Sequence, residues 1–201
     1  MILYLHGFRS SPTSFKARMM ADAMAERGLS AAWACPQLPA SPREAVAQAL
    51  DIARRQLAGA DSPRALTIIG SSLGGFYATW LAEHLGCRAV LLNPAVKPPR
   101  DLESYVGVST QYHSDEPFEF KHEYIAELRS LVVPAISRPQ RYLLLAATGD
   151  EVLDWREMVA HYPGARQIVI QGSDHGMAEF VDYLDEVLAF CGVAPAGKVL
   201  R

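Results

Sequence analysis

The stretch that decides the fold is Leu66-Thr67-Ile68-Ile69-Gly70-Ser71-Ser72-Leu73-Gly74-Gly75-Phe76-Tyr77-Ala78. It begins as a short apolar run, which predicts a buried strand, and it ends in residues typical of a packed helix. Between the two lies a match to G-x-S-x-G, in which the chain turns sharply and holds the central serine at the tip of the turn. Glycines are needed on both sides of that serine, because a Cβ there would collide where strand and helix pack closely.

The phase of this motif selects Ser72 as the candidate nucleophile and leaves Ser71 as a small filler. Leu73 would place its backbone N–H at the start of the helix, where it can point at a developing oxyanion. The alternative is a tight structural turn with no chemistry, because a five-residue pattern alone is weak evidence. The strand–turn–helix context favours the nucleophile.

Size and composition predict one domain with a full core. The chain has 201 residues, half of them hydrophobic, and a formal net charge of −3. That charge, with no basic stripe, argues against nucleic acid as the main partner, and no apolar run is long enough for a membrane span. The chain starts directly with a predicted strand, so we expect no secretory signal and a cytoplasmic protein.

The cysteines support the same compartment. Cys35, Cys87 and Cys191 are odd in number and have no metal-ligand spacing, so we expect reduced, mostly buried thiols. None stands beside a histidine in the sequence, and a cysteine nucleophile is therefore disfavoured. We expect neither a metal nor an organic cofactor.

Strands and helices alternate along most of the chain. The predicted strands are residues 2–5, 29–35, 66–69, 89–92, 141–146 and 167–170, and the longer helices follow them at 15–27, 42–58, 72–85, 154–162 and 177–191. Such alternation implies a mainly parallel sheet of about six strands covered on both faces, a three-layer α/β/α sandwich. In such sheets the functional residues sit in loops at the carboxyl ends of the strands.

The alternation is lost in residues 95–139, a stretch broken by prolines and rich in aromatic residues. Only residues 122–131 look helical, and a stretch of this length is usually functional. We expect a cap over the site that shapes the acyl pocket; the alternative is a surface excursion whose aromatics pack only on the domain. The expected pocket residues of this cap are Tyr105, Tyr112 and Phe118.

A serine hydroxyl needs a base to take its proton, and the base needs a third group to orient it. For this motif the expected chain order is Ser, then Asp or Glu, then His. Asp150 follows the predicted strand 141–146, and His175 follows the strand 167–170, so both lie at carboxyl ends in the required order.

Each assignment has an alternative. Asp154 could be the acid, but the run Asp154-Trp155-Arg156-Glu157 fits a capping box, which favours a helix cap. Glu151 could reach the site, but its side chain should diverge from that of Asp150. His175 could be only a polar residue at a helix start. Of the six histidines, it alone lies in a loop after a late strand.

A second oxyanion donor is expected from a loop after an earlier strand. His6-Gly7-Phe8 follows the first strand, and Gly7 lets the backbone approach closely. We assign the second donor to the Phe8 N–H, beside that of Leu73. His6 is expected beside the substrate pocket, where bracing the loop is favoured over catalysis.

These features together resemble the α/β-hydrolase superfamily and, more narrowly, the small bacterial YqiA-like esterases. The similar stretches are Leu3-Tyr4-Leu5-His6-Gly7-Phe8 with Ser10-Ser11-Pro12, the run from Gly70 to Leu81, Asn93-Pro94-Ala95-Val96, and Thr148-Gly149-Asp150-Glu151-Val152-Leu153-Asp154. The resemblance implies a compact hydrolase that lacks the first two strands of the larger fold and acts as a carboxylesterase on short acyl esters.

The leading hypothesis is therefore a serine hydrolase acting on a small-molecule ester, with Ser72, His175 and Asp150 as its triad. Thioester hydrolysis or acyl transfer to an acceptor other than water would use the same triad. A noncatalytic binding protein that kept the fold is the alternative from another class. The sequence leaves the oligomeric state and the natural acyl group open.

Overall fold

The computed structural model describes residues 1–58, 60, 62–112 and 116–194. Within them, the main sheet has six strands in the order β2-β1-β3-β4-β7-β8, and every neighbouring pair is parallel. The predicted fold class is confirmed. The strands are β1 (Ile2–Leu5), β2 (Trp33–Ala34), β3 (Thr67–Ser71), β4 (Arg88–Leu92), β7 (Tyr142–Ala147) and β8 (Arg166–Ile170).

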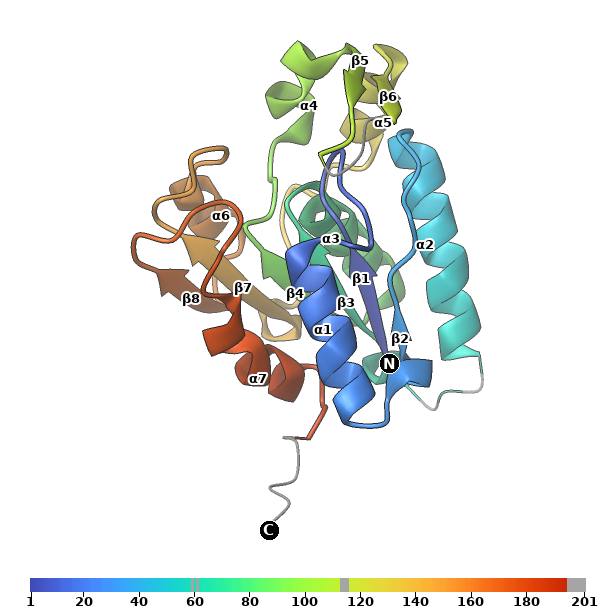
Figure 1. Ribbon diagram of the computed structural model, residues 1–201, viewed down its shortest axis with the longest axis vertical. Helices are drawn as coiled ribbons and strands as arrows, with labels where there is room; N and C mark the ends of the chain where they lie inside the picture. Colours follow the sequence, from blue (N-terminus) through green and yellow to red (C-terminus); the bar gives the residue numbers. More distant parts are fainter. Residues whose placement is uncertain (59, 61, 113–115, 195–201) are drawn as a thin grey trace.

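Helices cover both faces of this sheet (Figure 1). On one face, α1 (Phe15–Glu26) and α7 (Phe180–Phe190) bury side chains such as Met20 and Val187 against Tyr4 and Ile69 of the sheet. On the other face lie α2 (Pro42–Leu57), α3 (Leu73–Leu85) and α6 (Trp155–His161). The strands are apolar on both sides because both faces are covered.

Local signals explain several helix boundaries. Ser41 accepts a hydrogen bond from the Glu44 N–H and so caps α2, with Pro42 at its first position. Asp154 likewise caps α6 by accepting the Arg156 N–H. Gly86 ends α3 in the left-handed region, with φ of 74°.

Two predicted element boundaries are wrong in detail. The second strand, predicted over 29–35, is only Trp33–Ala34, because the short 3₁₀ helix η1 (Ser30–Ala32) takes its first part. The last helix begins at Phe180 rather than at Met177, whose φ of 56° breaks the helix. Phe15, the first residue of α1, is 49% exposed and faces a cavity described below.

The segment 95–139 forms a separate layer beyond the carboxyl ends of β1, β3 and β4 (Figure 1). The predicted helix is present as α5, and the structure adds a short helix and an antiparallel hairpin. Residues 113–115 of this segment, His113 among them, lie outside the described residues. Its elements are α4 (Pro98–Asp101), η3 (Glu103–Tyr105), β5 (Gly107–Thr110), β6 (Pro117–Phe120) and α5 (Glu123–Ser130).

Two further 3₁₀ turns, η2 (Pro63–Ala65) and η4 (Pro139–Arg141), lead into β3 and β7. The three cysteines are free thiols, with Cys87 and Cys191 buried and Cys35 half-buried. Among the described residues, no helix combines the length and the apolar character that crossing a membrane requires.

Candidate active site

Ser72 sits at the tip of a strained turn between β3 and α3. Its φ of 54° and ψ of −121° are unusual for a residue with a side chain. A Cβ at Gly70 would come within 2.2 Å of the Gly74 carbonyl oxygen, and one at Gly74 would come within 2.0 Å of the Leu5 carbonyl oxygen. The two glycines therefore allow the backbone approach that this turn requires.

Three of the predicted side chains meet at this turn. His175 Nε2 lies 3.1 Å from Ser72 Oγ, and His175 Nδ1 lies 2.8 Å from Asp150 Oδ2. Because an ionised carboxylate only accepts, the imidazole donates from Nδ1 to Asp150 and leaves Nε2 free to accept the serine proton. The structure thus brings together the predicted nucleophile, the predicted base and the predicted orienting acid with the spacing of a catalytic triad.

The Asp150 carboxylate is held rigidly. Its side chain is fully buried, and Oδ1 accepts the backbone N–H groups of Val152 at 2.9 Å and Leu153 at 2.8 Å. These charge-assisted bonds leave Oδ2 for the imidazole. The neighbouring Glu151 meets His175 differently, because its Oε2 accepts the backbone N–H of His175 at 3.0 Å.

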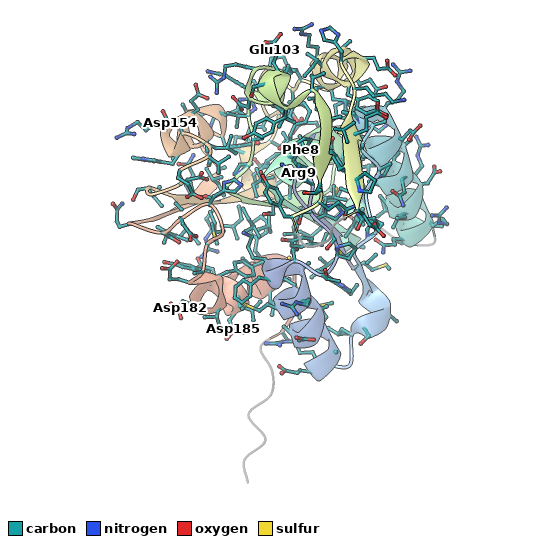
Figure 2. All side chains as sticks on the ribbon, turned by 45° about the horizontal axis from the view of Figure 1, so that its top comes forward. Phe8, Arg9, Glu103, Asp154, Asp182 and Asp185 are labelled. Carbon is teal, nitrogen blue, oxygen red and sulfur yellow. The ribbon has the colours of Figure 1, made fainter. Side chains whose placement is uncertain are left out.

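Two further acids near these loops bind backbone N–H groups instead. Asp154 caps α6 and stands at the outer edge of the molecule (Figure 2), so it is a helix cap and not part of the triad. Asp174 accepts the Met177 N–H through Oδ1 and thereby shapes the loop that carries His175.

The two expected oxyanion donors flank Ser72. The N–H groups of Phe8 and Leu73 have no acceptor among the residues that the structure describes, and Leu73 is the first residue of α3. A Cβ on Gly7 would lie 3.2 Å from the Ser72 Cβ, so the loop after β1 passes directly beside the serine. Free donors at this place can stabilise negative charge that develops on a bound carbonyl oxygen.

His6 is a buried brace. Its Nε2 accepts the Leu38 N–H at 3.0 Å and its Nδ1 donates to the Gly7 carbonyl oxygen at 3.0 Å, which fixes one neutral tautomer. Burial lowers the pKa of this imidazole, against the smaller opposite effect of its hydrogen bond to the Gly7 carbonyl. These two hydrogen bonds are consistent with the expected role of His6 in bracing the loop after β1.

A cavity of about 560 Å³ opens over Ser72 and His175. Tyr105 and Tyr112 line it, as the cap hypothesis expects. His6 and Phe118 do not, which corrects their assignment to the pocket; both line a separate cavity of about 20 Å³. Phe118 is turned away because its ring packs edge-on against Phe8, with centroids 5.2 Å apart.

The segment 95–139 also packs against the loop after β1. The Phe8 ring packs edge-on against Tyr105 and Phe120 as well, at 5.7 and 5.1 Å. Arg9, which has a φ of 55°, accepts the Tyr112 N–H on its carbonyl oxygen, and its guanidinium lies 4.6 Å from the centre of the Tyr112 ring. Figure 2 shows Phe8 and Arg9 beside the hairpin. The segment therefore packs on the domain and lines the cavity at once.

Sequence reasoning missed Asn93, which ends β4. The buried Asn93 amide donates to the carbonyl oxygens of Asp174 at 3.1 Å and His175 at 3.2 Å, and its Oδ1 accepts the Ala147 N–H at 2.8 Å. One side chain thus ties the His175 loop to the ends of two strands. The signal in the sequence was an asparagine directly before a proline at a strand end, which reads only as a turn.

Among the described residues, no group of three or more His, Cys, Asp or Glu side chains could hold a metal ion.

Comparison with known proteins places the chain in a family. The model of UPF0227, described as "Uncharacterised protein family (UPF0227)", matches residues 1–192. The chain belongs to the UPF0227 family. That match spans the triad residues, the loop after β1 and the segment 95–139.

Solved structures share the α/β-hydrolase fold. A protein from Agrobacterium vitis S4 matches with a TM-score of 0.73 at 20% identity, over 94% of this chain and 87% of that chain. Est1E from Butyrivibrio proteoclasticus, with ferulic acid bound, matches with a TM-score of 0.64 at 14% identity, over 94% and 87%. The esterase domain of a Rhodothermus marinus protein gives 0.62 at 20%, over 94% and 85%.

Proposed function

We propose that this UPF0227 protein is a serine hydrolase that cleaves carboxylic esters of short acyl chains through an acyl-enzyme on Ser72. The observation that carries the proposal is the hydrogen-bonded line Ser72 Oγ, His175 Nε2, His175 Nδ1 and Asp150 Oδ2, at 3.1 and 2.8 Å. Esterases among the structural neighbours support ester hydrolysis as the reaction of this site.

The first half of the reaction forms the acyl-enzyme. Ser72 Oγ attacks the ester carbonyl carbon while His175 Nε2 takes the serine proton. The resulting oxyanion accepts the N–H groups of Phe8 and Leu73. When the carbonyl re-forms, the bond from carbon to the alcohol oxygen breaks, and His175 gives its proton to the departing alcohol.

The second half releases the acid. A water molecule gives a proton to His175 Nε2 and attacks the acyl carbonyl carbon, which forms a second oxyanion in the same place. Its collapse breaks the bond to Ser72 Oγ, and the proton returns to the serine. Asp150 stays ionised throughout and stabilises the imidazolium.

The cavity sets the substrate class. It is mostly apolar, it contains the serine, and its volume of about 560 Å³ lies in the usual range for small-molecule sites. Neither step uses a group that the chain lacks, so no organic cofactor is required. Thioesters would follow the same steps with a thiol as leaving group.

The test is hydrolysis of 4-nitrophenyl esters of graded acyl length by the wild type and two serine variants. Ser72→Ala should lower kcat on the order of 10³-fold or more, since the covalent route is lost, and Ser71→Ala should retain far more activity. A silent Ser71→Ala protein beside an active Ser72→Ala protein would contradict the assignment. Failure of the folded wild type both to hydrolyse any ester and to react with a fluorophosphonate probe would favour a noncatalytic protein.

A further inference from the structure

The proposed triad leaves one cationic group in the cavity unused, the ammonium of Lys16. Lys16 is the second residue of α1, and its side chain lines the same cavity as Ser72 and His175. It is only 8% exposed, which is rare for lysine.

The Lys16 ammonium is only partly satisfied. Its Nζ donates to the Gly176 carbonyl oxygen at 2.6 Å, and within the described residues it makes no other hydrogen bond. An ammonium carries three donors, and leaving buried donors unpaired is costly. A buried ammonium that lines a cavity and uses one of its three donors points to a ligand that brings its own acceptors.

The two acids whose charges act on Lys16 already have other partners. Asp150 and Asp174 act on its charge from the loops after β7 and β8. Both oxygens of Asp150 already accept hydrogen bonds, Oδ2 from His175 and Oδ1 from the backbone N–H groups of Val152 and Leu153. Asp174 Oδ1 accepts the Met177 N–H. Both acids attract the ammonium electrostatically, but neither supplies a hydrogen bond to it.

Two acids, Glu151 and Asp101, line the cavity itself, and each already has a partner. Glu151 accepts the His175 N–H through Oε2. Asp101 on α4 forms an ion pair with Arg100 through Oδ1 at 2.6 Å. Among the described residues that line the cavity, Lys16 is the only lysine or arginine.

We propose that Lys16 binds a carboxylate of the substrate, so that the enzyme prefers esters that carry a free carboxylate close to the scissile bond over neutral esters of the same size. The inference rests on the proposed ester hydrolysis. The hydroxyl-bearing Ser10 and Ser14 line the same cavity and offer neutral donors to the same group.

The alternative role for Lys16 is positioning. Its bond to Gly176 ties α1 to the residue that follows His175, so its removal could loosen the base for every substrate. The two roles predict different kinetics: a lost carboxylate contact changes discrimination between substrates, whereas a displaced base lowers kcat for all of them alike.

The experiment compares monoethyl succinate with ethyl butyrate in a pH-stat at pH 7, with carboxymethyl butyrate as a third substrate. The first carries its carboxylate on the acyl side and the third on the alcohol side, so the two arms locate the contact. Wild-type kcat/KM should be higher for one of the charged esters than for ethyl butyrate. A wild type that favours ethyl butyrate over both charged esters would overturn the proposal, whatever the variants do.

Lys16→Met removes the charge and keeps the aliphatic stem, and Arg18→Met removes one charge from an exposed position of the same helix. In Lys16→Met, the ratio of kcat/KM for the preferred charged ester to that for ethyl butyrate should fall about 10- to 100-fold, as for a lost charge-assisted bond. In Arg18→Met the ratio should not change. An unchanged ratio in Lys16→Met, or an equal fall of kcat for every ester, would refute the proposal.

Lys16→Gln is the second variant in case Lys16→Met does not fold, since its amide can still donate to the Gly176 carbonyl. It should show the same loss of discrimination. Calorimetric binding of succinate to the Ser72→Ala protein, weakened by adding Lys16→Gln, gives a readout without turnover, and unchanged binding would count against the contact. Ethyl butyrate hydrolysis that survives Ser72→Ala would instead contradict the proposed function.

Discussion

Asn93 offers a sharp test of how the base is held in place. Asn93→Ala removes two bonds to the carbonyl oxygens of Asp174 and His175 and one bond from the Ala147 N–H, at a position with no solvent exposure. Each such bond contributes about 0.5–1.5 kcal/mol net, so the loss should be about 1.5–4.5 kcal/mol. The native φ of 43° adds a penalty on the order of 1 kcal/mol for alanine.

Urea unfolding followed by circular dichroism measures this loss, and an ester assay measures kcat on the same samples. Asn93→Gly is the matched control, because glycine tolerates the positive φ and loses the same three bonds. It should be more stable than Asn93→Ala by about 1 kcal/mol and share its lowered kcat. An Asn93→Ala protein with wild-type stability and wild-type kcat would refute the claim that this side chain holds His175.

Three further predictions concern the acid, the cap and the buried lysine. Asp150→Asn should lower kcat on the order of 10³-fold or more in an ester assay, because the wrong imidazole tautomer is held; Glu151→Gln keeps an acceptor for its backbone partner and should lose far less, and equal losses would contradict this. Replacing Tyr105 and Tyr112 together by Ala should shift the preferred acyl length in an assay with esters of graded length, while Ser72 still reacts with a small fluorophosphonate. An unchanged preference in a folded protein would show that the segment 95–139 does not set acyl-chain specificity. Burial lowers the pKa of Lys16 from 10.5 to about 8. Between these two values the unfolded chain binds more protons than the folded one, so the unfolding free energy of the wild type, measured relative to that of Lys16→Met, should rise from pH 8 towards pH 10.5. A difference in unfolding free energy that stays flat across this range would contradict the lowered pKa.

The sequence was sufficient for the sheet and for the meeting of Ser72, Asp150 and His175, because the signals for both are local and strong. The β3–α3 turn needs glycines on both sides of Ser72, and the acid and base follow strands whose apolar runs are plain. Parallel strands place their carboxyl ends at one edge, which brings Asp150 and His175 to Ser72.

The segment 95–139 was harder because its strands lack the usual pattern. The β5–β6 hairpin has strands of four residues, and Val108 is 74% exposed, so no alternation of buried and exposed residues marks them. The direction in which Phe118 faces depends on its packing against Phe8, a contact between residues far apart in the chain. Sequence spacing carries no information on such a contact.

Residues that act through backbone groups were missed for a similar reason. Asn93 binds two carbonyls and one N–H, and the partners of such bonds leave no trace in the side-chain pattern. The position of Lys16 on the first turn of α1 looks like an ordinary exposed lysine until the loop after β8 covers it.

The most direct test of the proposed mechanism is to trap the acyl-enzyme. Rapid acid quench of the wild type mixed with 4-nitrophenyl butyrate, followed by intact-mass and peptide mass spectrometry, should show one butyryl group on the peptide that contains Ser72. The adduct should persist in Ser71→Ala and vanish in Ser72→Ala. A butyryl group on Ser71 or on a cysteine, or full turnover by a Ser72→Ala protein, would contradict the account.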